Sequence, residues 1–203
     1  TAVDMEVTGD YSVTYTVSDA AGNAATPVVR TVTVRDPTAP VITLTGDAAV
    51  TLEYGATYTE LNATATDNYD ASVTVIVGGD TVDTSVLGTY TVTYNATDAA
   101  GNSAAALQRV VTVEDSTAPV ITLIGADPQI LDVSTNGVVS NYVELGAQAQ
   151  DAHDGDVPGI TIDATAVDME VTGDYSVTYT VSDAAGNAAT PVVRTVTVRD
   201  PTA

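Results

Sequence analysis

The sequence predicts an all-β protein made of tandem small antiparallel β-sandwiches, and three observations support this fold class. First, segments 88–98 and 173–183 alternate strictly between apolar and polar residues, which is the period-two pattern of a half-buried antiparallel strand. Second, each segment leads into Asp-Ala-Ala-Gly-Asn, a hairpin signal in which Gly supplies positive φ and Asp or Asn bonds the local backbone. Third, no stretch shows the 3.6-residue period of a helix.

The other elements follow in the same order in two stretches of the chain. We expect strands at 41–44, 50–53, 58–66, 73–77, 88–98 and 107–113 in the first stretch, and at 120–123, 129–133, 142–150, 160–163, 173–183 and 192–198 in the second. In segment 88–98 the alternation turns Tyr90, Val92 and Tyr94 to one face, so these tyrosines are expected in a core. About seven short strands in roughly 80 residues are typical of a small β-sandwich.

An internal repeat sets the domain organisation. Residues 1–39 recur letter for letter as residues 165–203, and such a repeat indicates a tandem array. Starting each module at Thr-Ala-Pro gives modules at 38–116 and 117–201, with 1–37 as the C-terminal half of a further module and 202–203 as the start of the next. We therefore expect the chain to be a window of a longer polymer that alternates two related modules.

Composition excludes several classes of protein. The chain has 27 acidic residues against five Arg and no Lys, for a net charge of −22. Such a charge makes the chain repel itself, so cations are expected around it, and it argues against nucleic acid as a partner. The absence of Cys excludes disulfides and zinc–thiolate sites. No apolar run approaches the roughly 18 residues of a membrane span.

Several motifs together carry a resemblance to a known family. They are Thr-Ala-Pro-Val-Ile-Thr-Leu at a module start, Tyr-x-Glu-Leu at 58–61 and 142–145, Gly-x-Tyr-x-Val-x-Tyr, Asp-x-Ala-Gly-Asn, and a closing Arg-x-Val-x-Val. In this order they resemble the Ig-like modules repeated in bacterial surface proteins and giant adhesins, which are similar to hyalin-type and cadherin-like repeats. The resemblance covers nearly the whole chain. It implies Greek-key Ig-like topology and an extracellular or cell-surface stalk, but no particular ligand.

Acidic loops are the one site-like feature. An Ig-like sandwich brings the start of its first strand, its B–C loop and its F–G loop to one end, so acidic residues of these segments are expected to converge. One group is Asp36, Asp67, Asp70, Asp98 and Asn102, and the other is Asp115, Asp151, Asp154, Asp156, Asp183 and Asn187. Carboxylate and amide oxygens suit Ca²⁺, which takes six to eight oxygen ligands. The sequence therefore predicts Ca²⁺ at the module junctions, with the second group the richer one.

Simpler interpretations stand beside the metal hypothesis. The same aspartates could serve only as turn formers on a solvated surface. His153, the single histidine, lies in an acidic loop and is expected to be solvated. Asn62 and Asn95 begin glycosylation sequons, which matter only in an organism that glycosylates Asn. Without Cys or Lys and with one His, the usual nucleophile–base pairs cannot be built, so we predict that the segment is not an enzyme.

The sequence thus predicts a structural repeat segment of a long extracellular fibre or adhesin stalk, stiffened by calcium at module junctions. Its partners would be the neighbouring modules of the same chain, joined by short linkers in which Pro limits bending. Two alternatives remain open. One is an adhesive module that binds a glycan or a partner cell, and the other is a self-assembling filament, a homopolymer formed by lateral pairing or strand exchange.

Overall fold

The computed structural model describes residues 2–133 and 141–201 and confirms the all-β prediction. These residues form fifteen strands, and no helix among them is long and apolar enough to cross a membrane. The chain divides into two compact units. The first comprises Thr1–Thr51, Thr57–Asp83 and Thr89–Thr112, and the second comprises Leu52–Ala56, Thr84–Gly88 and Val113–Ala203. The module boundaries at 38–116 and 117–201 stay predictions from the repeat.

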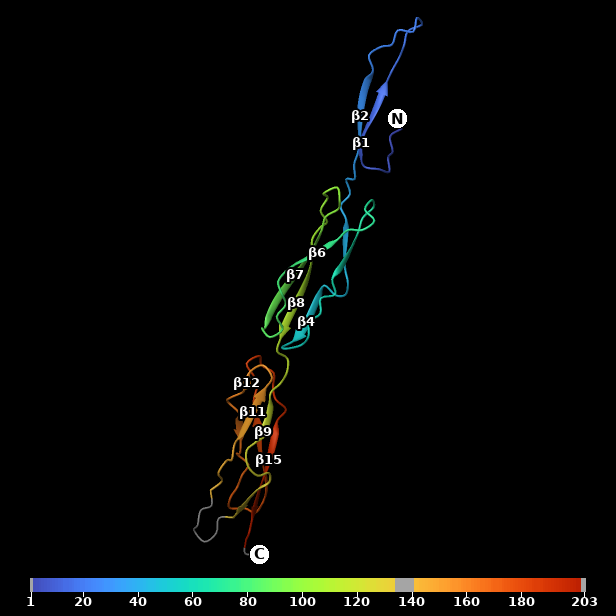
Figure 1. Ribbon diagram of the computed structural model, residues 1–203. Helices are drawn as coiled ribbons and strands as arrows, with labels where there is room; N and C mark the ends of the chain where they lie inside the picture. The colour runs from blue at the N-terminus through green and yellow to red at the C-terminus, as the bar shows by residue number, and fades with distance from the viewer. Residues whose placement is uncertain (1, 134–140, 202–203) are drawn as a thin grey trace. The chain divides into compact units, whose positions relative to one another are not determined.

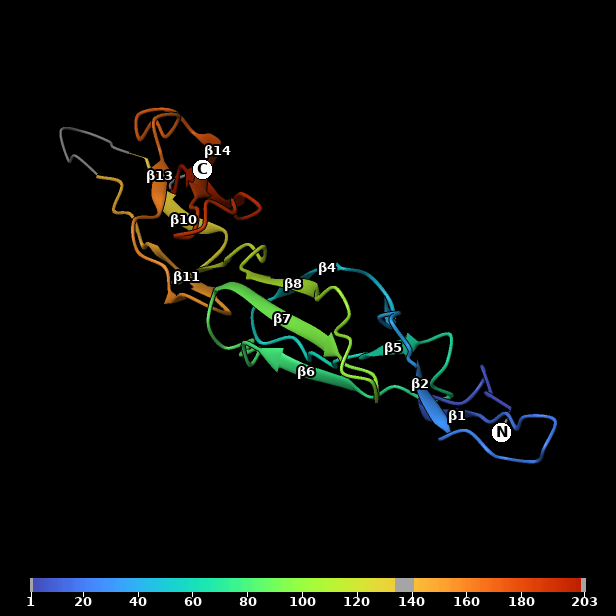
Figure 2. The ribbon, with the colours of Figure 1, turned by 90° about the horizontal axis from the view of Figure 1, so that it is seen from above.

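The first unit contains a hairpin and most of a two-sheet sandwich (Figure 2). The hairpin pairs β1 (Gly9–Tyr15) with β2 (Val28–Val34). One sheet pairs β3 (Val41–Leu44) with β5 (Ala63–Thr66), and the other has the order β4-β8-β7-β6, made of β4 (Ala49–Glu53), β6 (Val75–Gly79), β7 (Gly88–Ala96) and β8 (Leu107–Glu114). Ile42 of β3 packs in one buried cluster with Val92 and Tyr94 of β7, so the core lies between the two sheets.

The second unit is a sandwich of a three-stranded and a four-stranded sheet (Figure 1). The smaller sheet has the order β12-β11-β9, made of β9 (Val120–Leu123), β11 (Ala147–Asp151) and β12 (Gly155–Asp156). The larger has the order β10-β15-β14-β13, made of β10 (Gln129–Asp132), β13 (Thr161–Asp163), β14 (Gly173–Thr180) and β15 (Val192–Arg199). Ile121 and Ala149 from the first sheet meet Val177, Tyr179 and Val196 from the second in one core.

The β10–β15 pair departs from the expected antiparallel arrangement. β10 runs parallel to β15, with Gln129 opposite Val196. The physical reason is the path of the chain, because residues 124–128 carry it from β9 in one sheet to β10 in the other instead of turning it back beside β9. The β10 strand therefore closes the edge of β15 without a hairpin.

Two expected strands begin later than the alternation predicts. The segments expected at 58–66 and 142–150 become strands only at Ala63 and Ala147. In each case a glutamate carboxylate accepts a hydrogen bond from the backbone N–H two residues further along the chain. Glu60 Oε1 accepts the Asn62 N–H at 2.7 Å, and Glu144 Oε1 accepts the Gly146 N–H at 2.6 Å. This hydrogen bond turns the chain before the strand begins. In the first unit the backbone at this turn is in the left-handed region, with a φ of 62° at Asn62.

The same glutamates hold a buried arginine in each sandwich. In the first unit Arg109, 1% exposed, pairs with Glu60 and donates from Nε to the Asp47 carbonyl at 2.9 Å. The Tyr94 hydroxyl donates to the same carboxylate at 2.6 Å. Burial by itself would raise the pKa of Glu60, but hydrogen bonds from tyrosine hydroxyls and the Asn62 N–H lower it overall. The pair is therefore held charged, with hydrogen bonds that offset its desolvation.

The second unit repeats this network. Arg194, fully buried, lies 3.3 Å from Glu144 and donates to the Ile124 carbonyl at 2.6 Å. Tyr142 and Tyr179 both donate to the Glu144 carboxylate, and burial together with that carboxylate raises the pKa of Tyr142 to about 12. The Tyr-x-Glu-Leu and Arg-x-Val-x-Val motifs of the sequence therefore meet in space as one structural network.

Candidate metal centres

The first acidic group lies within the first unit. Asp36 follows β2, Asp67 follows β5 and Asp98 follows β7, and one carboxylate oxygen of each lies within 4.8 Å of the others. Asp36 and Asp98 are each only 8% exposed. The Oδ2 atoms of Asp36 and Asp67 are buried without a hydrogen-bond partner among the described residues. Three acidic side chains from distant segments thus converge with unsatisfied oxygens.

Hydrogen bonds within local turns fix the orientation of these carboxylates. Asp67 Oδ1 accepts the N–H groups of Tyr69 and Asp70 at 2.9 and 3.1 Å, and these bonds lower the pKa of the Asp67 carboxyl. Asp98 Oδ1 accepts the Asn102 N–H at 2.7 Å across the Asp-Ala-Ala-Gly-Asn turn. The turn therefore uses one oxygen of Asp67 and leaves the other directed into the group.

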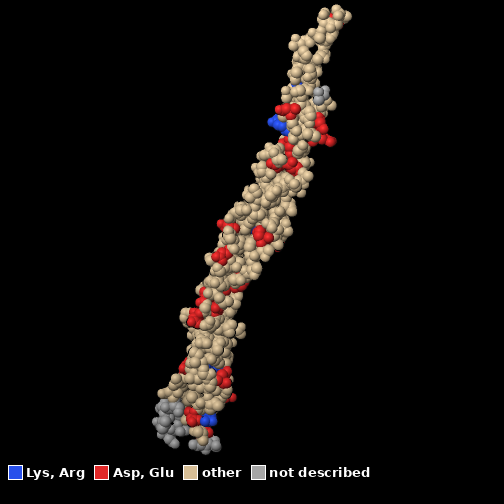
Figure 3. All heavy atoms as spheres, viewed as in Figure 1, with Lys and Arg blue, Asp and Glu red and all other residues tan. Residues whose placement is uncertain are grey.

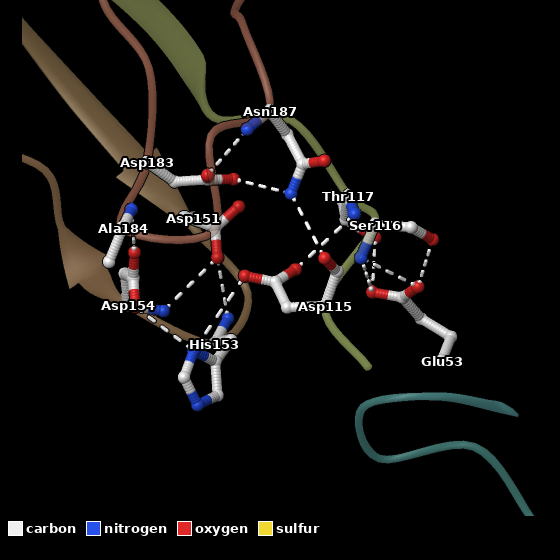
Figure 4. Close-up of polar contacts among 10 residues, drawn as sticks. All are labelled: Glu53, Asp115, Ser116, Thr117, Asp151, His153, Asp154, Asp183, Ala184 and Asn187. Carbon is white, nitrogen blue, oxygen red and sulfur yellow. Dashed lines mark hydrogen bonds and ion pairs between the residues drawn. The ribbon is translucent and has the colours of Figure 1, made fainter. Parts of the chain in front are cut away.

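The second acidic group has the same construction in the second unit (Figure 4). One carboxylate oxygen each of Asp115, Asp151 and Asp183 lies within 4.8 Å of the others, and the three residues are 8%, 9% and 8% exposed. Asp151 Oδ1 accepts the N–H groups of His153 and Asp154 at 2.7 and 3.1 Å. Asp183 Oδ1 accepts the Asn187 N–H at 2.7 Å. The two groups therefore have the same local geometry in the two units.

The second group brings several carboxylates of the same charge together in a buried position. Burial raises the pKa of the Asp115 carboxyl, and the charges of Asp151 and Asp183 raise it further. Burial alone would also raise the pKa of Asp183, but hydrogen bonds from Asn187 lower it overall. Asp115 Oδ2 and Asp151 Oδ2 are buried without a hydrogen-bond partner among the described residues. Unpaired buried carboxylate oxygens are costly unless a cation compensates them.

Other predicted ligands hold the loops together. Asp70 Oδ2 accepts the Ala99 N–H at 2.7 Å, and Asp154 Oδ2 accepts the Ala184 N–H at 2.8 Å, so each ties its loop to the following hairpin. In each unit an asparagine binds the linker with its amide nitrogen. Asn102 Nδ2 donates to the Asp36 carbonyl at 3.0 Å, and Asn187 Nδ2 donates to the Asp115 carbonyl at 3.1 Å.

Two residues of the second loop differ from the sequence-based expectation. Asp156 is exposed and its Oδ1 accepts a hydrogen bond from Gln150 Nε2, so it lies outside the converging carboxylates. His153 was expected to be solvated, but its side chain is only 29% exposed and lies beside Asp115 and Asp154. Metal binding by any of these residues stays a prediction.

The donor set fits a hard divalent cation. Ca²⁺ binds carboxylate oxygens, backbone carbonyls and waters at about 2.3–2.6 Å in flexible geometry. Each group supplies three carboxylates, and its buried oxygens without hydrogen-bond partners would be stabilised by a cation. Acidic atoms also recur over the surface of both units, where basic ones are few (Figure 3). A cation at each group would neutralise part of the negative charge of the chain, which its five arginines do not balance.

Comparison with known proteins agrees with this architecture. The family described as bacterial surface protein, Ig-like domain matches residues 1–34, 42–113 and 121–198. Hyalin of Strongylocentrotus purpuratus is 32% identical over 94% of this chain and 16% of its own length. Internalin I of Listeria monocytogenes is 30% identical over 98% of this chain and 11% of its own length. Hyalin of Lytechinus variegatus is 33% identical over 94% of this chain and 37% of its own length. The chain therefore spans a minor part of each of these relatives.

Proposed function

The chain belongs to the family of bacterial surface protein Ig-like domains, and from this premise we propose that it is a structural segment of an extracellular fibre or adhesin stalk, stiffened by Ca²⁺ at its module junctions. The observation that carries the proposal is the recurrence of one acidic group at equivalent loops of both modules, with buried oxygens left unpaired. Membership of a surface-protein family supports the extracellular location. A repeated site suits a repeated structural role better than a single ligand cleft.

The position of the linker aspartate explains how a cation would stiffen the chain. Asp115 belongs to the linker that enters the second sandwich, whereas Asp151 and Asp183 belong to loops of that sandwich. An ion bound to all three would fasten the linker to the domain that follows it. Without the ion, the linker is held by hydrogen bonds such as that from Asn187 Nδ2, and the carboxylates repel one another.

A second contact already restrains the same linker. The Glu53 carboxylate accepts hydrogen bonds from the Ser116 N–H at 3.1 Å and from the Thr117 hydroxyl at 2.8 Å. Hydrogen bonds from the hydroxyls of Ser116 and Thr117 lower the pKa of Glu53. Because this contact needs no metal, it sets a baseline stiffness on which the proposed cation would add.

Thermal unfolding and solution scattering of the whole chain test the proposal. Excess Ca²⁺ stabilises a site by about 2.7 kcal/mol at a hundredfold excess over Kd, which corresponds to a Tm increase of roughly 5–10 °C for a chain of this size. Chelator should reverse this increase and make the scattering profile that of a more flexible chain. Equal ionic strength in NaCl is the control for charge screening.

A matched variant separates metal binding from turn formation. Asp151→Asn keeps an oxygen that can accept the His153 and Asp154 N–H groups but removes the charge. We expect the variant to lose the Ca²⁺-dependent rise in Tm of the second unit while it retains its fold. Identical melting and scattering in Ca²⁺ and in chelator for the unmodified chain would show that the acidic loops are turn formers only.

A further inference from the structure

The surroundings of His153 differ from those of the other residues in the acidic loops. His153 Nδ1 lies 2.9 Å from Asp154 Oδ1 and 3.7 Å from Asp115 Oδ2. The imidazole also packs against the ring of Tyr54 in an edge-to-face contact, with centroids 4.6 Å apart and planes at 76°. This contact fixes the ring's orientation, so Nδ1 is held towards the two carboxylates (Figure 4).

The Asp115 carboxylate indicates a ligand-binding site beside His153. Its side chain is 1% exposed, and its Oδ2 is buried with no hydrogen-bond partner among the described residues. That oxygen faces His153 Nδ1 at a distance too long for a hydrogen bond. A buried anionic oxygen opposite a ring nitrogen, with a second carboxylate beside both, is a set of side chains that could bind a cation.

From this geometry we propose that Asp115, His153 and Asp154 form a mixed nitrogen–oxygen site for a divalent transition metal such as Zn²⁺. Imidazole nitrogen is a ligand that Zn²⁺ prefers and Ca²⁺ does not use. Zinc ligands at about 2.1 Å in tetrahedral geometry lie about 3.4 Å from one another. The 2.9 and 3.7 Å separations from His153 Nδ1 lie on either side of that value, so small side-chain shifts suffice. The metal would replace the hydrogen bond between Nδ1 and Asp154 Oδ1, with the imidazole proton on Nε2.

The inference deepens the proposed calcium-stiffened junction and rests on it for its role, though not for its geometry. Asp115 is common to the all-oxygen group and to the mixed group. A metal held by Asp115 and His153 would therefore fasten the same linker to the same loop. It would do so at one of the two equivalent loops, because the other has a tyrosine in this place.

The chain contains its own control for this site. Asp67 Oδ1 accepts the N–H of Tyr69 as Asp151 Oδ1 accepts that of His153, so Tyr69 and His153 occupy the same loop position. His153→Tyr thus converts the second loop to the residue that the first loop carries. The variant keeps an aromatic ring and the turn and removes only the nitrogen ligand.

The test uses the full chain, freed of Ca²⁺ by chelation and dialysis, and titrates it with Zn²⁺ alone. Because the sequence has a single histidine, its imidazole NMR signals report on this site. We expect the His153 signals to shift saturably with Zn²⁺ and the Tm to rise. His153→Tyr should weaken calorimetric Zn²⁺ affinity at least about tenfold, since even outer-shell partners of a metal contribute that much. Co²⁺ should give the visible absorption of a nitrogen-ligated ion only in the unmodified chain.

The outcomes distinguish this inference from the calcium proposal. Unshifted His153 signals, or equal Zn²⁺ affinity of the unmodified chain and His153→Tyr, would overturn the mixed site. The Ca²⁺-dependent Tm is measured separately, and His153→Tyr should retain it. A Zn²⁺ response without any Ca²⁺ response would therefore refute calcium stiffening and leave the mixed site standing, whereas the reverse result would refute the mixed site alone.

Discussion

The hairpins β1–β2 and β14–β15 have identical sequences but different surroundings. Both are antiparallel with the same register, since Gly9 lies opposite Val34 as Gly173 lies opposite Val198. Their exposure differs sharply. Tyr15 is 51% exposed and Val17 is 68% exposed, whereas the corresponding Tyr179 and Val181 are 0% and 8% exposed. The described segment contains no front half of a module before β1–β2, whereas β9 and β11 precede β14–β15 and pack against it, so the same hairpin register forms with and without this cover.

The covering strands account for the difference. In the second unit the β14–β15 hairpin shares a core with Ile121, Ala149 and Val157, which come from the preceding part of the same sandwich. The arginines show the same contrast. Arg30 and Arg194 lie 5.7 and 5.5 Å above the rings of Tyr15 and Tyr179, so this local stacking is common to both hairpins. Arg194 is buried and paired with Glu144, whereas Arg30 is exposed.

The largest expected difference between the hairpins lies in these arginines. Arg194→Met should destabilise the second unit by about 3 kcal/mol, because it leaves the Glu144 carboxylate unpaired. Arg30→Met should change the free energy of unfolding by less than about 0.5 kcal/mol, as surface substitutions do. Urea unfolding of the two variants measures both values. Equal effects would mean that the buried ion pair contributes nothing beyond the local stacking.

A smaller difference is expected at the asparagines that close the two turns. Asn23 Nδ2 and Asn187 Nδ2 both donate to the aspartate of their own turn, at 2.8 and 2.9 Å, but Asn187 also donates to the Asp115 carbonyl. Asn187→Ala should therefore cost about 1 kcal/mol more than Asn23→Ala, the worth of one further hydrogen bond. Thermal unfolding of the pair measures this difference, and an equal loss in both would show that the linker bond is not stabilising.

The smallest expected effect is a pH dependence confined to the second hairpin's network. Burial alone would raise the pKa of Glu144, but hydrogen bonds from Tyr142 and Tyr179 lower it overall. A carboxyl with a lowered folded-state pKa stabilises the fold above its unfolded pKa of about 4.3, and this stabilisation is lost as the pH falls through the folded-state value.

The Tm advantage of the unmodified chain over Glu144→Gln should therefore shrink between neutral pH and about pH 3. Arg30→Met serves as the control, because its difference from the unmodified chain should stay constant over the same range. A Glu144→Gln difference that is independent of pH would argue against a charged Glu144 in the folded state.

Much of the candidate site could be predicted without coordinates. The Asp-Ala-Ala-Gly-Asn turn forms as expected in each copy, with Asp98 N–H bonded to the Asn102 carbonyl and Asp183 N–H bonded to the Asn187 carbonyl. The convergence of Asp36 with Asp67 and Asp98 followed from the loop order that the family resemblance implied. Asp156 is exposed and accepts a hydrogen bond from Gln150 Nε2, a placement that acidic spacing along a loop does not reveal, and its predicted metal binding stays a prediction.

The local pattern thus determined most strands and the Asp-Ala-Ala-Gly-Asn turns of this protein, because alternation and turn residues act over a few positions of the chain. The tertiary structure decided the partners across long separations. Examples are the pairing of Arg109 with Glu60, the parallel approach of β10 to β15, and the placement of His153 against Tyr54. The β14–β15 hairpin shows the physical reason, because its apolar face is buried by Ile121, Ala149 and Val157 from earlier in the chain. A side-chain pattern specifies which face is apolar, but burial is a property of the surface that covers it.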